Sequence, residues 1–371
     1  MAAPFSVLLP VQRSLAILCV CVLLVSSVPA QQKEQKEQPP VRIITTVNRV
    51  VVPVTITDKK GEFVTDLTRS DFAIFDNDQP QRMDAFELTT WPLSLVVVVD
   101  TSTRMAPLMP DLRKSGILLT QLVLGETGEA AVITYDQEVS IVQEFTANGD
   151  LVEKAIKNLH AGGAESHMHD AVFRAIGRLK MRPEERRKVI FLIGEGADRG
   201  SQNELGQALR EAQLSGISIY CVELSTMKAL AKQPPPDTTI DPLPPGARGP
   251  TPGRPPVPEA ANSGSFLPLI IEAVRGIKKT IFSKPMKAYT EGTGSEHINT
   301  FTEHGFEQAI QRMGQDLHSQ YLISYSPNNL RGSEFHNITV RLTRPGMKVR
   351  ARPGYYYVSP EGIPAPADPK K

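Results

Sequence analysis

A group of oxygen-bearing side chains follows a largely apolar run in the first half of the chain. The run Leu93–Val99 leads into Asp100, and the residues after it are Thr101, Ser102, Thr103 and Arg104. Carboxylate and hydroxyl oxygens are ligands that Mg²⁺ and Mn²⁺ prefer in proteins. The segment therefore predicts either a site for a hard divalent cation or a structural turn followed by a helix cap.

Two histidines lie two residues apart further along, His167 and His169, with His160 nearby. Imidazole favours Zn²⁺ or Cu²⁺ over Mg²⁺. A third ligand at a suitable spacing is not evident, so the pair reads either as part of a metal site or as a solvated loop with a pH-sensitive charge.

A mostly parallel sheet is expected to position these groups. Apolar runs alternate with helical patterns of ten or more residues, which is typical of an open, doubly wound α/β sheet. The expected strands are 93–99, 129–135, 188–193 and 217–224, and the expected helices are 111–122, 150–159, 170–180, 203–214 and 306–317. Ligands of such sheets bind beyond the carboxyl ends of the strands, where Asp100 lies.

The two ends of the chain show a different pattern. Alternating or aromatic-rich strands are expected over 41–57, 72–75 and 83–88, and again over 320–326, 335–343 and 348–358. Neither group has enough strands for a stable core alone. We therefore predict one smaller β-sandwich built from both ends, with the α/β domain inserted between its halves.

The expected order of segments follows from these patterns. Proline is concentrated in 233–258, which favours an extended, disordered insert. The predicted segments are a signal peptide (1–30), a linker (31–40), the first part of the sandwich (41–90), the α/β domain (91–317), the second part of the sandwich (318–358) and a flexible tail (359–371).

The first thirty residues are expected to direct export. Arg13 precedes the uncharged apolar run Leu15–Val25, and Ala30 offers a small residue for cleavage. The run is too short for a membrane span, which takes about 20 residues. The protein is therefore expected to be secreted or periplasmic, without stable membrane insertion.

Removal of the signal would leave Cys221 as the one cysteine, inside the apolar run 217–224. A buried thiol of this kind usually packs as a small hydrophobe and does not act as a nucleophile. No disulfide is then possible within the mature chain.

Composition excludes one class of partner. Hydrophobic residues make up 40% of the 371 residues, enough for a buried core, and 41 Lys and Arg balance 40 Asp and Glu. A near-neutral chain lacks the basic surface that nucleic-acid binding requires.

The segment 95–104 (LVVVVDTSTR) resembles the first metal-site segment of von Willebrand factor type A domains, in which an apolar strand precedes Asp-x-Ser-x-Ser. Gly162–Ser166 before a helix and Gly194-Glu195-Gly196 after a strand strengthen the likeness. With its flanking strands and export signal, the chain is similar to secreted bacterial proteins of this class, including a group common in acidobacteria.

The resemblance implies a metal site that is altered in this chain. Asp100 and Ser102 match the family's ligands, Ser166 stands where Thr is usual, and Glu195 stands where Asp is usual. Arg104 replaces the second serine of the motif and offers no acceptor. Mg²⁺ or Mn²⁺ is therefore expected to be weakly held or absent.

The resemblance also implies a non-catalytic module for adhesion or scaffolding, which binds an acidic side chain of another protein. The residues expected to face that partner are Arg104, Glu165 and His167. Two alternatives stay open, namely a metal-assisted hydrolase that uses the histidines and a purely structural envelope component. No arrangement of nucleophile and base favours the first.

Overall fold

The computed structural model describes residues 49–88, 91–225, 284–330 and 334–357. The predicted signal peptide, linker, proline-rich insert and tail lie outside the described residues. The strands are β1 (Val50–Thr57), β2 (Phe72–Asp76), β3 (Gln79–Gln81), β4 (Met83–Leu88), β5 (Leu93–Asp100), β6 (Glu129–Tyr135), β7 (Val139–Thr146), β8 (Arg187–Gly194), β9 (Ser218–Leu224), β10 (His297–Thr300), β11 (Tyr321–Tyr325), β12 (Glu334–Leu342), β13 (Lys348–Ala351) and β14 (Gly354–Tyr357).

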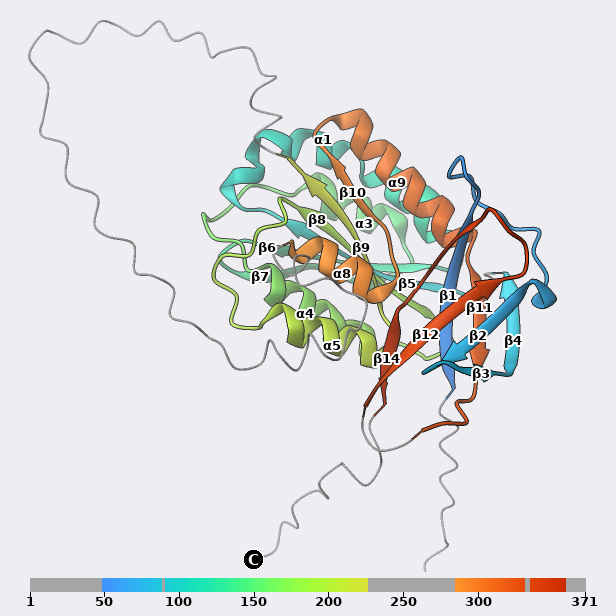
Figure 1. Ribbon diagram of the computed structural model, residues 1–371. Helices are drawn as coiled ribbons and strands as arrows, with labels where there is room; N and C mark the ends of the chain where they lie inside the picture. Colours follow the sequence, from blue (N-terminus) through green and yellow to red (C-terminus); the bar gives the residue numbers. More distant parts are fainter. Residues whose placement is uncertain (1–48, 89–90, 226–283, 331–333, 358–371) are drawn as a thin grey trace, which may run out of the picture. The chain divides into compact units, whose positions relative to one another are not determined.

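The helices flank the central strands (Figure 1). They are α1 (Met109–Lys114), α2 (Gly116–Leu119), α3 (Gly149–Lys157), α4 (Met168–Lys180), α5 (Leu205–Leu214), α8 (Pro285–Thr293) and α9 (Glu303–His318). Short 3-10 turns cover Arg69–Asp71 and Thr103–Leu108, and a π-helical turn covers Thr120–Leu124.

The central sheet has the strand order β10-β9-β8-β5-β6-β7. Every neighbouring pair in it is parallel except β6 with β7. β5 lies in the middle, and all eight of its residues are buried. A strand covered on both faces must be apolar on both, which is why its sequence does not alternate.

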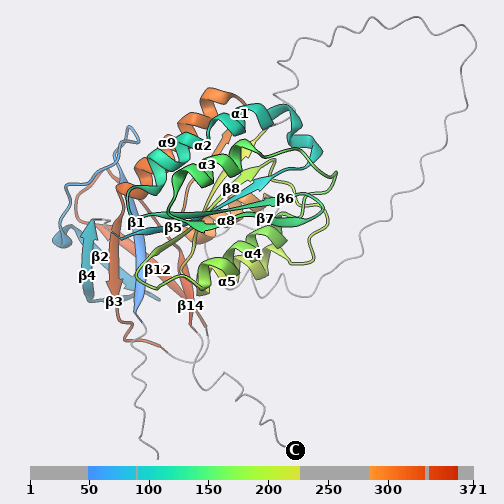
Figure 2. The same ribbon diagram turned by 180° about the vertical axis from the view of Figure 1, so that it is seen from behind.

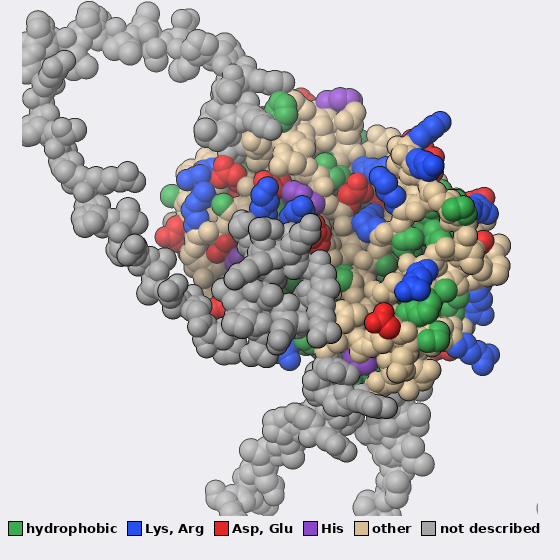
Figure 3. All heavy atoms as spheres, viewed as in Figure 1, with side chains coloured by type: hydrophobic (Ala, Val, Ile, Leu, Met, Phe, Trp, Pro, Cys, Tyr) green, Lys and Arg blue, Asp and Glu red, His purple; other side chains and the backbone are tan. Residues whose placement is uncertain are grey.

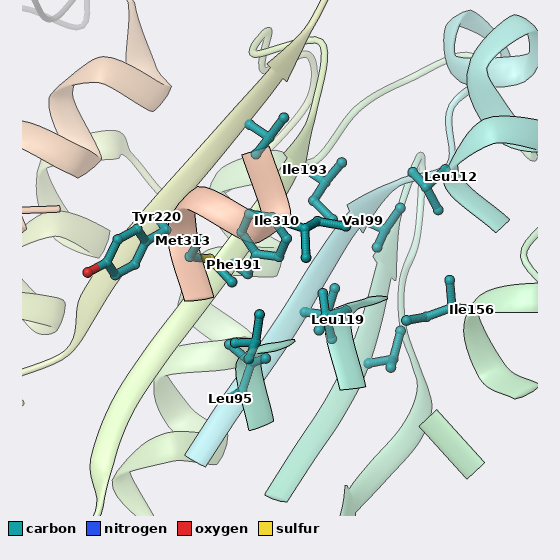
Figure 4. Close-up of a cluster of buried hydrophobic side chains, with 14 of the residues drawn as sticks. Leu95, Val99, Leu112, Leu119, Ile156, Phe191, Ile193, Tyr220, Ile310 and Met313 are labelled. Carbon is teal, nitrogen blue, oxygen red and sulfur yellow. The ribbon is translucent and has the colours of Figure 1, made fainter. Parts of the chain in front are cut away.

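Helices cover both faces of this sheet (Figures 1 and 2). On one face, Val97 and Val99 of β5 pack in a core with residues of α1, α2, α3 and α9, part of which Figure 4 shows. On the other face, Val96 and Val98 pack with α4, α5 and α8. The predicted doubly wound α/β class is confirmed.

Strands from both chain ends combine into two antiparallel sheets, of order β13-β1-β11-β4 and β14-β12-β2-β3. In the first sheet, C-terminal and N-terminal strands alternate, and in the second a C-terminal pair lies beside an N-terminal pair. One core contains residues of both groups, such as Val52, Ile74, Ile323 and Tyr355. The predicted sandwich built from both ends is confirmed. The domain boundaries assigned from the sequence stay predictions.

The sandwich is joined to the α/β domain through buried polar contacts. Asp316 of α9 is fully buried and accepts hydrogen bonds from Thr55 Oγ1 (2.6 Å) and Arg350 Nη2 (2.5 Å). Gln320 Nε2, at the start of β11, donates to Tyr220 Oη of β9 (2.9 Å). These contacts fix the amino edge of the central sheet against the sandwich.

Two predicted elements differ from those observed. The helix expected over 111–122 is divided at Ser115, where α1 ends and Gly116 begins α2. A Cβ at Gly116 would lie 3.2 Å from the Ile156 side chain, so this turn packs closely on α3. The strand expected over 348–358 is divided before Pro353, and its halves β13 and β14 pair with β1 and β12 in different sheets.

Four elements were not predicted from the sequence, the three-residue strand β3 among them. β7 is an edge strand with alternating burial, and β10 and α8 follow the undescribed segment 226–283. β10 has only four residues and no apolar run, so the pattern carries no strand signal.

Candidate functional site

Three loops meet at the carboxyl edge of the central sheet. The first follows β5, the second precedes α4 and the third follows β8. Main-chain hydrogen bonds join the first two, from Gly162 N to Thr101 O (2.6 Å) and from Thr103 N to Gly163 O (2.8 Å). Ser166 and Arg199 exchange two further main-chain bonds, of 3.2 and 2.8 Å, which join the second loop to the third.

Asp136, just after β6, supports the second loop. Its Oδ2 accepts from Gly163 N (2.9 Å), and its main-chain oxygen accepts from His167 N (2.8 Å). A Cβ at Gly162 would lie only 2.0 Å from Asp136 Oδ2, so glycine is required there. Sequence reasoning missed Asp136, although a carboxylate after a strand and a Gly-Gly pair are both visible signals.

Asp100 lies at the centre of the three loops and is 1% exposed. Its Oδ1 accepts from Ser102 N (2.8 Å), and its Oδ2 accepts from Ser166 Oγ (3.3 Å). Burial raises the pKa of Asp100, because water no longer solvates the charge; these donors oppose that rise. The structure thus brings Asp100, Ser102 and Ser166 together.

Two buried hydroxyls beside Asp100 have no hydrogen bond of ordinary geometry to any described residue. They belong to Ser102, which is 1% exposed, and to Tyr135, which is fully buried. Burial raises the pKa of Tyr135, and the nearby charge of Asp100 adds to this effect. The cluster therefore retains hydrogen-bonding capacity that its described neighbours do not use.

Glu195 is held between two arginines at the rim of the site. Its Oε2 lies 3.3 Å from Arg104 Nη1 and 3.7 Å from Arg199 Nη1. The two arginine side chains are 49% and 38% exposed, and that of Glu195 is 17% exposed. Arg199 was missed by sequence reasoning, although its position four residues after Glu195 could have indicated the contact.

The side chains of His167 and His169 point to different partners. His167 Nε2 lies 2.8 Å from Glu165 Oε2 at the surface. His169 belongs to α4, is 8% exposed and bonds through Nδ1 to Tyr289 Oη (2.9 Å). Burial lowers the pKa of His169. The interpretation of His167 and His169 as two ligands of one ion is therefore wrong.

Two further kinds of feature are absent from the described residues. No group of three or more His, Cys, Asp or Glu side chains there could hold a metal ion, and no helix there is long and apolar enough to cross a membrane. Cys221 is 1% exposed, and burial raises its pKa well above the ordinary value, as expected for an unreactive thiol.

Residues 95–197, which include all three loop segments around Asp100, match the von Willebrand factor type A domain family. This part of the chain is similar to a type A domain. Domains of this family are generally non-catalytic modules of protein interaction. The match includes Asp100, Ser102, Arg104, Ser166 and Glu195, so the resemblance drawn from the sequence is confirmed at the level of the family.

Solved structures that are similar to part of this chain include three bacterial proteins. The aerotolerance-related membrane protein of Bacteroides fragilis is 16% identical, with a TM-score of 0.36, over 60% of this chain and 98% of that one. The PilB minor pilin of Streptococcus sanguinis is 10% identical, with a TM-score of 0.39, over 63% of each chain. The vWF domain of the pilus tip protein Mfa5 of Porphyromonas gingivalis is 20% identical, with a TM-score of 0.27, over 30% of this chain and 40% of that one. No curated protein matches the chain in sequence.

Proposed function

We propose that this protein is an exported, non-catalytic binding module whose type A domain captures an acidic group of a partner protein through Arg104 and Arg199. The observation that carries the proposal is the sharing of Glu195 by these two arginines, at 3.3 and 3.7 Å. One carboxylate cannot neutralise two guanidinium groups. Arg104, Arg199 and Glu195 together therefore carry one net positive charge, next to the buried carboxylate of Asp100.

The exposure of the two arginines supports capture of a carboxylate from solution. With 49% and 38% of their side chains exposed, both can present further N–H groups outward. A planar guanidinium can bind a carboxylate through two parallel hydrogen bonds. Glu165 and His167, which contact each other at the neighbouring loop, would complete the partner-facing rim.

We further propose that this binding does not require a divalent cation. Asp100, Ser102 and Ser166 offer oxygen ligands, but Glu195 is engaged by two arginines and Arg104 has no acceptor. A positive charge this close to a divalent ion costs several kcal/mol even in a screened environment. The donor set therefore does not fit a tightly bound Mg²⁺ or Mn²⁺, and we infer a degenerate form of the family's metal site.

Export rests on the first thirty residues, and we propose a secreted or periplasmic location. The face shown in Figure 3 carries Lys and Arg interspersed with Asp and Glu, in keeping with the near-neutral composition. Such a surface favours recognition by a local group of side chains over long-range attraction to a polyanion.

A calorimetric titration tests the role of Arg104. The unmodified protein should show no measurable binding of Mg²⁺ or Mn²⁺, and the Arg104→Ser variant should bind them because it removes the repulsion and restores a hydroxyl ligand. The Arg174→Ser variant, changed at an exposed arginine of α4, is the matched control. Tight Mg²⁺ binding by the unmodified protein would refute the metal-independent reading.

Partner capture tests the function itself. Immobilised protein should retain the same envelope proteins from its native host with and without a chelator. A double variant, Arg104→Gln with Arg199→Gln, should lose them, whereas Arg174→Gln should not. Retention that disappears with the chelator, or that survives in the double variant, would overturn the proposal.

A further inference from the structure

A cavity of about 630 Å³ lies between the amino ends of the central strands and the sandwich, at the edge of the sheet opposite to Asp100. Six segments of the described chain line it: the start of β1, Trp91, the stretch from the end of α4 to the start of β8, the turn from α5 to β9, Leu322 of β11, and Arg352 with β14. Figures 1 and 2 both show β14 beside α5. This volume lies within the usual range for small-molecule sites, roughly 300–1,000 Å³.

Arg352, just before β14, supplies a positive charge to this cavity. Its Nε donates to Gly354 O (3.0 Å) and its Nη2 to Gln213 O (3.4 Å), both main-chain carbonyls. No described carboxylate lies within 4.0 Å of its guanidinium nitrogens. Burial lowers the pKa of Arg352 to about 10, so the group is still charged at neutral pH. A desolvated cation without a counter-charge indicates a place for an anion.

The other basic residues of the cavity differ in how far they are already engaged. Arg186 pairs with Glu129 at 3.1 Å, Lys180 pairs with Glu211 at 3.2 Å, and Arg187 donates to Leu317 O at 2.6 Å. Lys188 has no carboxylate within 4.0 Å among the described residues.

The surroundings of Lys188 change the pKa of its ammonium group. Burial lowers its pKa, and the negative charges of Glu184 and Glu185 oppose that effect. These two glutamates also line the cavity and are exposed, which places them at its mouth. Arg352 and Lys188 are therefore cations of the cavity that have no described carboxylate within 4.0 Å, and the exposed Arg49, which lies over Trp91, is another.

Aromatic side chains form much of the remaining wall. Trp91 and the tyrosines 355, 356 and 357 line the cavity, and Arg49 lies over the Trp91 ring at 5.9 Å. Flat apolar surfaces next to a fixed cation suit a ligand with a ring at one end and an anion at the other.

We propose that this cavity binds a small organic carboxylate with a planar apolar body, whose carboxylate pairs with Arg352 and lies near Lys188. The guanidinium fork provides the bidentate partner, and the aromatic wall contacts the apolar body. The negative charges at the mouth, Glu184 and Glu185, disfavour dianions and polyanions such as phosphate esters. This site is separate from the arginine rim at the carboxyl edge and does not depend on the function proposed for that rim.

The sequence provides a direct probe, because Trp91 is the only tryptophan of the chain and lines the cavity. Titration with benzoate should change the tryptophan fluorescence in a saturable way, and calorimetry should give the same dissociation constant. Benzamide, the neutral analogue of similar shape, should bind at least tenfold more weakly, because a hydrogen bond to a charged group contributes about 1.5–3 kcal/mol. Phenyl phosphate and inorganic phosphate should compete poorly.

Variants then locate the site. Arg352→Gln should weaken benzoate binding by about tenfold to a hundredfold, and Lys188→Gln should weaken it less. Arg341→Gln, changed at a β12 arginine that lies over Phe75 and does not line the cavity, is the control and should bind as the unmodified protein does. Thermal melts verify that each variant is folded. Should Arg352→Gln fail to fold, Arg352→Lys, which keeps the charge but loses the fork, and Lys188→Gln carry the test.

Three results would overturn the proposal. They are the absence of saturable binding of benzoate and of cyclohexanecarboxylate, equal binding of benzamide and benzoate, and unchanged benzoate binding in a folded Arg352→Gln or Lys188→Gln protein. Preferential binding of phenyl phosphate would contradict the argument from the glutamates at the mouth.

Discussion

Two buried aspartates lie at strand ends of this protein, and their surroundings differ. Asp76 at the end of β2 is fully buried and is bonded to Tyr325 Oη and Tyr355 Oη, both at 2.8 Å, and to His336 Nδ1 at 2.6 Å. Asp100 at the end of β5 is as deeply buried, but its bond from Ser166 Oγ is longer, at 3.3 Å. A nearby hydroxyl, that of Ser102, has no ordinary partner among the described residues.

The comparison indicates that Asp76 stabilises the sandwich, whereas Asp100 lies in the proposed binding site. The partners of Asp76 come from β11, β12 and β14, so the carboxylate joins strands of both sheets of the sandwich. A buried charge surrounded by donors on all sides costs most when it is removed. The donors to Asp100 come from loops at the carboxyl edge of the central sheet, at the site proposed above.

Removal of residues 320–371 should have the largest effect on this comparison. The truncation deletes β11 from between β1 and β4, together with Tyr325, His336 and Tyr355. The remaining sandwich strands would expose their apolar face, so the fragment should aggregate. Analytical ultracentrifugation and thermal melts measure this outcome. A soluble fragment that unfolds cooperatively would contradict the shared sandwich.

Asp76→Ala should have the next largest effect. The substitution leaves two tyrosine hydroxyls and a histidine buried without their shared acceptor, and should lower the free energy of unfolding by about 3–5 kcal/mol. Urea denaturation measures the loss. Asp84→Ala, at an exposed residue that accepts a bond from Ser326 Oγ, is the control and should change stability little. Similar losses for the two variants would remove the structural role assigned to Asp76.

Unlike Asp76→Ala, the substitution Asp100→Asn should raise the free energy of unfolding at neutral pH. Because burial raises the pKa of Asp100, the folded state binds the proton more tightly than the unfolded chain does. The penalty for the charged form is absent below the unfolded pKa, near 3.8, and complete above the folded pKa. The neutral isostere should therefore be more stable at pH 7, by on the order of 1 kcal/mol, and should lose this advantage as the pH falls.

Chemical denaturation of both proteins across this pH range measures the difference. A variant that is less stable than the unmodified protein at pH 7 would show that the donors around Asp100 fully stabilise its charged carboxylate.

Arg104→Gln should have the smallest effect on stability. Its ion pair with Glu195 is exposed on the arginine side, and such pairs contribute about 0–1 kcal/mol. A thermal melt should therefore shift only slightly, although the proposed partner should bind more weakly. A large loss of stability would mean that the arginine rim belongs to the architecture, like Asp76, and not to a binding site.

The sequence by itself determined the fold class and the place of the site. β5, β8 and β9 are apolar on both faces, and this property is local and therefore legible in the chain. The alternating strands at the two ends could not form a core separately, which predicted their combination. Asp100 and Ser102 follow a buried strand directly, so their position at the carboxyl edge was also fixed by local pattern.

The tertiary structure alone decided where the side chains of the loops point. Arg104 faces Glu195, and His169 turns into the core toward Tyr289, away from His167. Loop side chains have no repeating period, so their directions depend on packing between segments far apart in sequence. The cavity at Arg352 was not predicted for the same reason, because its wall is assembled from six described segments that no local pattern connects.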